Sequence, residues 1–580
     1  MKNKKYRAVF LTAAFLLPLS FSVLSLAGCS GNKPGTYVDA TVPDTLDLAA
    51  RGALAMQGLL NTLNSDADYA PYGSAAFGDG ATSYQSDWGD VVNAIIMGRN
   101  MSGSTYDQKA EDQTVNGLKK FLASGGVQNN ANTLSIGQLA LISQYALKPT
   151  AEVKKLLDEM SQKHLDSAAN AENYAYDYDG PWQDDSGGHG IIGYGENLSV
   201  NGAALRAVST WAFDGESEIS RELIMSLGEK YKNYLTLPRL WEAETTPKVV
   251  VDADRGRFNG DMSAYASGLL GLLTYARHAN DFETQRFVQA AYEYIRDYGL
   301  KSIGLFGDIC TTSKMTQLAI MLSQSGVGDY WDDAERYLRN EIAEKQITGA
   351  EGSGFAGAEG LFFTDSSYPT HISPINQVAD IDCTAQAVQA MYAAWRAVVS
   401  GDKGMAQVNM LLNRASDLLD VNSYLPYEGK VELNVKTAEA AAVRLPLWVD
   451  WSQAAVNVNG TSQAVKRTGQ YVMVEGLKTG DTVSITFPVK EWDETFTLLW
   501  KEGQPYMKST DPGEGWRAQA EPDKFTLTFR GYTLVEITPV TNKTGSNPDN
   551  RLLYQRTAMR SGTAPMISVK RFVPKTVIPH

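Results

Sequence analysis

Two cysteines, each close behind an aspartate, are the residues of this chain whose types and spacing could do chemistry. Asp308-Ile309-Cys310 and Asp382-Cys383 lie 73 residues apart (383 − 310), and each stands where a turn gives way to a helical pattern. Two carboxyl groups about 5–5.5 Å or about 6.5–9.5 Å apart can hydrolyse a glycosidic bond. Thiolates combined with a carboxylate or an imidazole can bind zinc. We therefore expect the two helix starts to face one pocket. The paired carboxyl groups indicate that this pocket is a glycosidase site.

The carboxyl groups are assigned roles by their expected surroundings. Asp382 is predicted to act as base or nucleophile, because the positive end of a helix dipole favours the ionised form. The acid is expected from Asp308, Glu196 or Asp261, and the last two also stand at the start of helical patterns. Helix capping is the simpler alternative for Asp308 and Asp382.

Two loops and one histidine supply candidate substrate contacts. Segment 177–196 is rich in glycine and aspartate, and segment 255–261 combines arginine, phenylalanine and asparagine. Aromatic rings stack on sugars, guanidinium groups pair with uronate carboxylates, and a loop histidine can bind a ligand or carry a proton. The predicted substrate-binding residues are Trp182, His189, Tyr194, Arg257, Asn259 and His371. A surface salt bridge for the arginine and an exposed position for His371 are the competing interpretations.

The cysteines themselves leave three alternatives open. Cys310 and Cys383 could bind zinc with Asp308 or His371, form a disulfide, or pack as free thiols. They lack the short spacing that identifies a zinc motif from sequence alone. We expect no cofactor, with zinc at the two cysteines as the alternative.

The N-terminus has the pattern of a bacterial lipoprotein signal. Four basic residues precede an apolar run over 8–26, and Leu26-Ala27-Gly28-Cys29 forms a lipobox. Cleavage before Cys29 and acylation of its thiol would anchor the mature chain by lipid. The sequence therefore predicts a signal peptide over 1–29, a tether over 30–41, and a membrane-anchored protein outside the cytoplasm, facing the periplasm or on the cell surface.

Charge and composition narrow the possible partners and the class of protein. A net charge of −14 disfavours nucleic acid as a partner, and 20% charged with 43% hydrophobic residues is typical of a globular chain. A chain of 580 residues is too long for one hydrophobic core. The expected partners are a carbohydrate substrate and a lipid anchor, while the oligomeric state is left open.

Helical patterns fill the first two thirds of the chain and short β-type runs follow. The absence of alternating strands predicts an α+β multidomain protein, with an N-terminal (α/α)6 toroid over 42–405 and one or two β-sandwich domains over 406–549. A tail over 550–580 is expected to pack on the body. The expected helices are 45–63, 91–100, 108–124, 133–146, 151–167, 201–211, 218–235, 263–278, 282–298, 312–324, 330–343 and 384–399.

Several ordered blocks resemble one enzyme family, the β-L-arabinofuranosidase-type glycoside hydrolases of the six-hairpin superfamily. The resemblance implies an (α/α)6 barrel followed by β-sandwich domains, with zinc held by a Glu-x-Cys and a Cys-Cys pair whose first cysteine is the nucleophile. In this chain Asp308 occupies the position of the family's glutamate, and Asp382 occupies the position of the family's nucleophilic cysteine. Cys310 and Cys383 match ligand cysteines, so the chain resembles a divergent member. The blocks are 263–299, 308–340, 382–395, 408–416, 443–448, 458–460, 476–488 and 554–556.

The sequence thus predicts a lipid-anchored glycoside hydrolase that acts on oligosaccharides or polysaccharide fragments, with arabinose- or uronate-containing sugars as candidates. Two alternatives stay open. A polysaccharide lyase would need a tyrosine or histidine base beside a group that neutralises the uronate. A glycan-binding lipoprotein without catalysis would explain the two replaced family residues.

Overall fold

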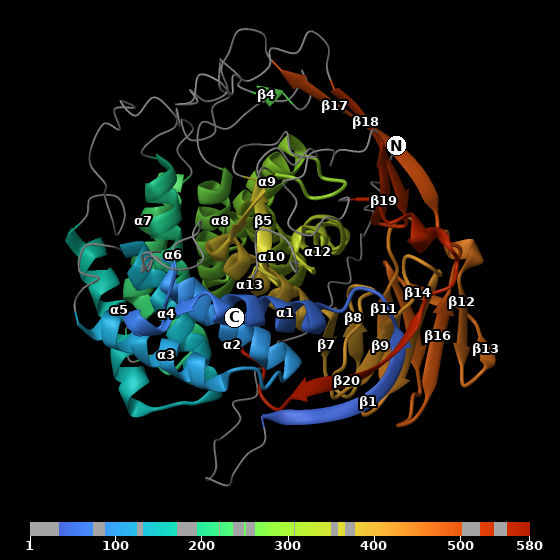
Figure 1. Ribbon diagram of the computed structural model, residues 1–580, viewed down its shortest axis with the longest axis horizontal. Coiled ribbons are helices and arrows are strands. Elements are labelled where there is room, and N and C mark those ends of the chain that lie inside the picture. Colours follow the sequence, from blue (N-terminus) through green and yellow to red (C-terminus); the bar gives the residue numbers. More distant parts are fainter. Residues whose placement is uncertain are drawn as a thin grey trace, which may run out of the picture.

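A computed structural model describes the chain over residues 34–72, 87–124, 131–170, 194–217, 219, 221–235, 249–250, 262–306, 308–349, 358–365, 377–500, 523–538 and 554–579. Helices occupy one side of the molecule and β-sheets the other (Figure 1). The predicted signal segment and Cys29 lie outside the described residues. Among the helices that are described, none carries an apolar stretch long enough to cross a membrane.

An inner ring of helices forms the centre of the helical part. Each inner helix packs against the next in chain order, and the last packs against the first, which closes the ring. The residues of these helices are buried on nearly every side, as in α2, where only a few positions reach solvent. The ring consists of α2 (Trp88–Ser102), α4 (Ala131–Leu147), α6 (Tyr194–Asp214), α8 (Met262–Ala279), α10 (Ile309–Ser325) and α13 (Ile381–Val398).

Outer helices alternate with the inner ones along the chain and cover the ring. Most of them are amphipathic: in α3, for example, the buried residues recur on one face at helical spacing. This alternation confirms the predicted (α/α)6 toroid. The outer helices are α1 (Leu48–Asn61), α3 (Gln108–Ala123), α5 (Ala151–Asn170), α7 (Arg221–Leu235), α9 (Phe282–Tyr298) and α11 (Trp331–Tyr337), which continues through a π-helical turn (Leu338–Ile342) into α12 (Ala343–Lys345).

Glycines allow two inner helices to approach closely. A Cβ atom placed on Gly271 of α8 would lie 2.1 Å from the carbonyl oxygen of Gly202 on α6, and one on Gly202 would lie 2.7 Å from the Cα of Gly268. Contacts this short exclude any side chain. The three glycines therefore set the tight α6–α8 contact of the ring.

A β-sandwich follows α13 directly. One sheet has the order β13-β12-β16-β10-β9 and the other β14-β15-β11-β8-β7. Alternate residues of β10, β15 and β16 are buried, and those of both sheets share one core, so the sheets pack face to face. The strands are β7 (Val399–Gly401), β8 (Ala406–Val408), β9 (Leu419–Ser423), β10 (Lys430–Val435), β11 (Ala440–Arg444), β12 (Ala455–Val458), β13 (Thr461–Gln463), β14 (Lys466–Thr468), β15 (Tyr471–Glu475) and β16 (Thr482–Thr486).

Smaller sheets and hairpins complete the body. A sheet of order β19-β18-β17-β4 joins β17 (Glu491–Trp500), β18 (Asp523–Arg530) and β19 (Thr533–Thr538) to β4 (Val249–Val250), which lies between α7 and α8 in the chain. The hairpin of β5 (Phe362–Asp365) and β6 (Gln377–Asp380) leads directly into α13, and β2 (Leu63–Asn64) pairs with β3 (Ala70–Pro71). Short 3-10 turns span Ser65–Ala67, Trp451–Gln453 and Thr557–Arg560.

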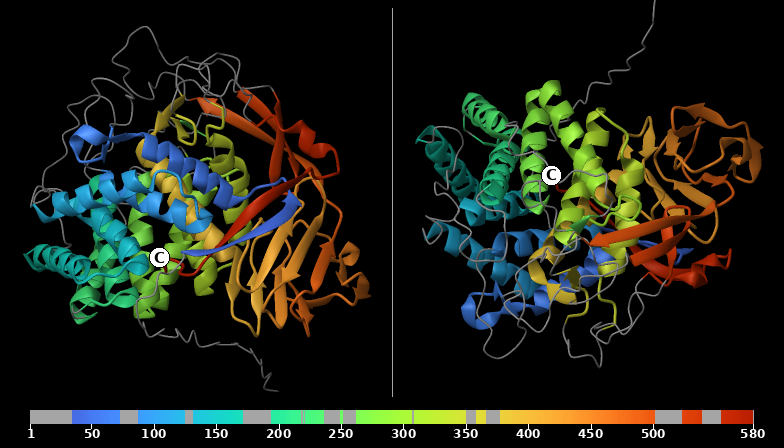
Figure 2. Two further views of the ribbon diagram at one scale, coloured as in Figure 1. Left: turned by 60° about the horizontal axis from the view of Figure 1, so that its bottom comes forward. Right: turned by 90° about the horizontal axis from the view of Figure 1, so that it is seen from above.

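The predicted tether over 30–41 is wrong for the part that the structure describes. Residues Gly35–Pro43 form β1, which pairs antiparallel along its whole length with β20 (Met566–Pro574). The two strands run side by side, along the lower edge of the molecule in Figure 1 and across the front of the left view in Figure 2. Their partners are more than 500 positions apart in the sequence, so no local pattern announces the pair.

Residues 554–579 lie against the helical and the β parts. The backbone N–H of Tyr554 donates to Glu344 Oε1 (2.6 Å), and its hydroxyl donates to Glu341 Oε1 (2.7 Å). Farther along, the N–H of Ile578 donates to the hydroxyl of Tyr392 on α13 (2.8 Å). The end of the chain thus contacts the inner ring itself.

A buried ion pair joins the sandwich to the barrel. The guanidinium of Arg444 on β11 bonds to the Asp332 carboxylate on α11 and lies 3.0 Å from Asp329 Oδ1. Arg444 and Asp332 are 2% and 5% exposed. Removing one member of a buried pair leaves the other charge desolvated and unpaired.

We expect Arg444→Ala to lower the free energy of unfolding by about 3–5 kcal/mol. Lys466→Ala removes an exposed ion pair of the same sandwich, that with Glu475, and should cost less than about 1 kcal/mol. Urea unfolding of both variants measures the two values. Equal losses would contradict the role of burial.

Candidate active site

The starts of two neighbouring inner helices come together at one end of the barrel. Asp308 caps α10, where its Oδ1 accepts the N–H of Thr311 (2.6 Å). Asp380 caps α13, where its Oδ1 accepts the N–H of Cys383 (2.9 Å). These side chains satisfy backbone donors that a helix start leaves unpaired. The two helix starts lie together, as the sequence predicted.

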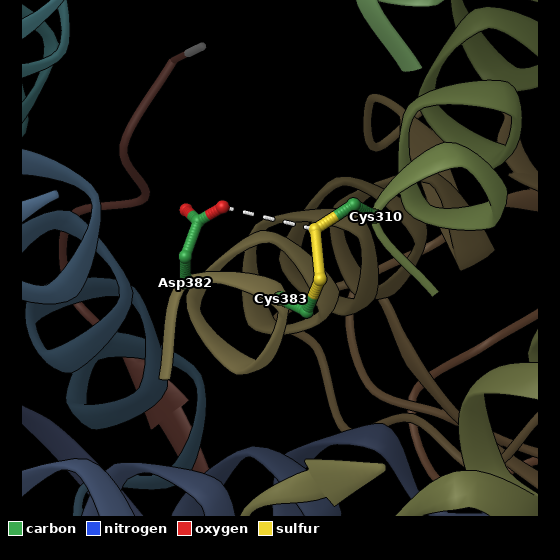
Figure 3. Close-up of side chains that lie close together, drawn as sticks. All are labelled: Cys310, Asp382 and Cys383. Atoms are coloured by element: carbon green, nitrogen blue, oxygen red, sulfur yellow. Dashed lines mark hydrogen bonds between the residues drawn. A yellow bond between two sulfur atoms is a disulfide. The ribbon is translucent and has the colours of Figure 1, made fainter. Parts of the chain in front are cut away.

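A disulfide bond links the two helix starts. Cys310 is the second residue of α10 and Cys383 the third of α13, and their Cα atoms lie 4.9 Å apart. Both cysteines are buried, at 5% and 7% exposure. Figure 3 shows the bond between the sulfurs, with Asp382 facing it. Of the three alternatives that the sequence left open, the structure contains the disulfide.

Asp382 lies beside this disulfide in the first turn of α13. Its Oδ2 is 3.8 Å from the Sγ of Cys310, the contact drawn in Figure 3. Gln386, one turn later, donates from Nε2 to Oδ1 (3.0 Å) and Oδ2 (2.9 Å). The carboxylate is half-buried, so it is held in place and still reaches solvent.

A second carboxyl group approaches Asp382 from α2. Asp90 is half-buried in the first turn of that helix, and its Oδ1 accepts a bond from Gln389 Nε2 of α13 (2.8 Å). Burial and the nearby charge of Asp382 raise the pKa of Asp90 to about 6, although the bond from Gln389 and the cations Lys314 and Arg206 oppose this. Asp90 can therefore carry a proton in mildly acidic solution.

Asp380 adds a third carboxyl group to the cluster. Burial raises its pKa to about 6, the charges of Asp382 and Asp308 act in the same direction, and the backbone bonds of its capping role oppose the shift. Because its oxygen caps α13, Asp380 has less freedom than Asp90 to reach a ligand. We assign it a structural role.

Two cations lie near enough to Asp90 to oppose the rise of its pKa. Arg206 of α6 donates from Nη2 to Gln317 Oε1 (3.0 Å), and Lys314 of α10 donates from Nζ to Ser263 Oγ of α8 (2.6 Å). Burial lowers the pKa of Arg206, while the Asp90 carboxyl opposes that shift. The site thus combines side chains from α2, α6, α8, α10 and α13.

The structure brings together four of the residues that the sequence singled out: Asp308, Cys310, Asp382 and Cys383. Asp308 caps its helix, the simpler of its two predicted roles, although it lies near enough to Asp380 to influence its pKa. Glu196 and Tyr194 fall in the first turn of α6, but their side chains lie outside the description. Also outside the described residues are Trp182, His189, Arg257, Asn259, Asp261 and His371.

Asp90 is the residue that sequence reasoning missed. The helix expected over 91–100 begins just after it, whereas Asp90 lies in the first turn of α2. One signal could have identified it: Asp90 and Asp382 both lie in the first turn of an inner helix. That parallel is visible only once the inner helices are known.

The family resemblance implies a zinc ion, which the donor atoms near the two helix starts would have to bind. The Sγ atoms of Cys310 and Cys383 and a carboxylate oxygen of Asp382 lie within 4.8 Å of one another, which suits a metal ion in distance. Zinc binds cysteine as a thiolate, however, and both sulfurs are joined to each other. Asp308, at the position of the family glutamate, bonds to the backbone. The residues as they stand do not fit zinc.

Comparison with protein families matches the sandwich. Residues 408–489 match the model of the middle domain of GH127 β-L-arabinofuranosidases. This range runs from the end of β8 past β16 and so covers most of the two five-stranded sheets. A search of curated protein sequences finds no significant match to the chain.

Comparison with solved structures matches most of the chain. A structure described as a glycoside hydrolase has a TM-score of 0.54 at 11% identity, over 81% of this chain and 82% of that one. A GH127 β-arabinofuranosidase has a TM-score of 0.52 at 12% identity, over 86% of this chain and 85% of that one. The chain shares its fold with these proteins. The resemblance predicted from the sequence is thereby confirmed, in the middle domain by sequence and across the barrel and sandwich by fold.

Proposed function

We propose that this protein is a glycoside hydrolase whose site lies at the starts of α2, α10 and α13. One observation carries the proposal: two half-buried carboxyl groups lie close together, and burial with the nearby charge of Asp382 raises the pKa of Asp90 to about 6. Hydrolysis of a glycosidic bond needs one carboxyl group that keeps its proton and another that stays ionised. The confirmed family resemblance supports the same reaction class.

In this mechanism Asp90 is the general acid and Asp382 the base or nucleophile. Asp90 gives its proton to the glycosidic oxygen as the bond to the leaving group breaks. Asp382, oriented by Gln386, either attacks the anomeric carbon or removes a proton from the attacking water. We assign the acid role to Asp90 because, of the three acids predicted from the sequence, Asp308 caps α10, while the side chain of Glu196 and the whole of Asp261 lie outside the description.

The proposed substrates are oligosaccharides or polysaccharide fragments that contain arabinose or a uronate. The similar GH127 protein is described as a β-arabinofuranosidase, which favours arabinose. Lys314 and Arg206 beside Asp90 favour a sugar acid, since cations compensate a uronate carboxylate.

A substrate screen of the mature protein tests this function. Aryl glycosides of arabinose, glucuronic acid and common hexoses would be offered beside uronate oligosaccharides, with release of the aryl alcohol or reducing sugar measured. Release from at least one glycoside is expected. Growth of ultraviolet absorbance from unsaturated products would instead indicate a lyase, and no turnover of any compound would favour a glycan-binding protein.

We also propose that the enzyme is anchored by lipid outside the cytoplasm. The lipobox ending at Cys29 supports this location, and so does the Cys310–Cys383 disulfide, because such bonds persist in oxidising compartments. Cell fractionation of the protein and of Cys29→Ala tests it. The wild-type chain should sediment with membranes and the variant should not; identical fractions would contradict the anchor.

A further inference from the structure

Cys310 and Cys383 stand at the positions where the family resemblance implies metal ligands, yet they form a bond with each other. We propose that this disulfide is a permanent part of the mature site, that it takes the place of a metal centre, and that it positions Asp382. The claim that the disulfide positions Asp382 rests on the proposed function. The covalent part, that the disulfide is permanent and takes the place of a metal centre, does not.

The disulfide lies between two neighbouring helices of the inner ring. It joins the first turns of α10 and α13, which are neighbours in the inner ring, and it closes a loop of 73 residues that includes α11, the π-helical turn and the β5–β6 hairpin. Both sulfurs belong to buried residues, so a reductant has little access to them. A bond in this place fixes two inner helix starts against each other.

The carboxyl groups that a metal would need already bond to protein groups. Asp308 bonds to the N–H of Thr311, and Asp382 receives both its bonds from Gln386. With the sulfurs joined, each neighbouring donor therefore has a protein partner. The cluster is complete as a metal-free structure.

Asp382 lies next to the disulfide both in the sequence and in space. This residue precedes Cys383 directly, and its Oδ2 lies 3.8 Å from the Sγ of Cys310 on the other helix. Displacement of the α13 start from α10 would therefore displace Asp382 from its place near Asp90. The disulfide acts as a positioning element, and the catalytic groups remain the two carboxyl groups.

Formation of the bond has a defined balance. Two thiols exchange with the disulfide of an extracytoplasmic thiol-oxidising protein; the chain loses two electrons and two protons, and the donor leaves as a dithiol. No metal or oxygen enters this step. The oxidant is thus a protein disulfide of the compartment to which we assign the mature chain.

The first experiment does not depend on catalysis. The full mature protein, purified without reductant, is alkylated under denaturing conditions before and after reduction, and its zinc content is measured by elemental analysis. We expect Cys310 and Cys383 to be alkylated only after reduction and zinc to be far below one per chain. Two thiols that react without reduction, with or without one zinc per chain, would overturn the proposal.

The second experiment compares the wild type with Cys310→Ser/Cys383→Ser, using the substrate found by the screen. A chelator should leave the rate of the wild type unchanged. The double variant should have a lower melting temperature, and its upper pH limit of activity should move to lower pH, because Asp382 then raises the pKa of Asp90 less. A lower melting temperature with an unchanged pH profile would remove the positioning role.

Reductant supplies the matched control. Once alkylation shows that the buried bond has been reduced, the pH profile of the wild type should shift in the same direction, while the double variant should be unaffected, since it has no disulfide. If no substrate is found, the alkylation and zinc results still decide the covalent part. Failure of the proposed function is thus distinguishable from failure of this inference.

Discussion

Asp382→Asn is expected to lower kcat by about 10³-fold, because an amide can neither attack the anomeric carbon nor accept a proton from water. The substitution keeps the shape of the side chain, and its oxygen can still accept a bond from Gln386 Nε2. The fold and KM should therefore change little. Initial rates over a range of substrate concentrations separate kcat from KM.

Asp308→Asn is the matched control for this variant. The same change of charge occurs next to the disulfide, but asparagine caps a helix about as well as aspartate. We expect activity within a few-fold of the wild type and little change in stability. A loss as large as that of Asp382→Asn would show that Asp308 takes part in the chemistry, and unchanged activity of Asp382→Asn would refute the carboxylate mechanism.

Asp90→Asn should have opposite effects on activity and on stability. Loss of the acid is expected to lower kcat by about 10²-fold or more for substrates with poor leaving groups, and less for aryl glycosides whose leaving group needs no proton. The difference between the two substrate types identifies the acid. Equal losses for both would argue against this role.

The stability effect follows from the pKa of Asp90, which rises from 3.8 to about 6 on folding. Well below pH 3.8 the carboxyl is protonated in both states and costs nothing; as the pH rises from there to 6 the unfolded state ionises first, and stability is lost. Above pH 6 the cost is at most about 3 kcal/mol. Asp90→Asn lacks this cost, so it should be the more stable protein at pH 8 and similar at pH 4.

Urea unfolding of both proteins at pH 4 and pH 8 measures this difference, and Asp380 titrates alike in each. Asp90→Glu is the control, because it keeps a titrating carboxyl group one methylene farther from the backbone. It should retain part of the activity and part of the pH dependence of stability. A wild type more stable than Asp90→Asn at pH 8 would contradict the raised pKa.

Local patterns determined the elements of this protein. The helix expected over 282–298 is α9 with the same bounds; the helix expected over 108–124 differs from α3 by one residue at one end, and that over 263–278 differs from α8 by one residue at each end. Short β-type runs likewise predicted the β-rich part that follows, in which residues of β15 and β16 alternate between buried and more exposed positions. Helix periodicity, caps and strand alternation are properties of neighbouring residues, so the sequence shows them directly.

Tertiary structure alone decided which elements meet. Asp90 reaches Asp382 across 292 positions (382 − 90) because α2 and α13 close the ring, and β1 finds β20 at the far end of the chain. The choice between zinc, free thiols and a disulfide depended on the distance between two helix starts, which no spacing in the sequence encodes. The sequence therefore determined the helices, strands and two halves of a site, while packing of the ring decided that the halves face each other and that Asp90 joins them.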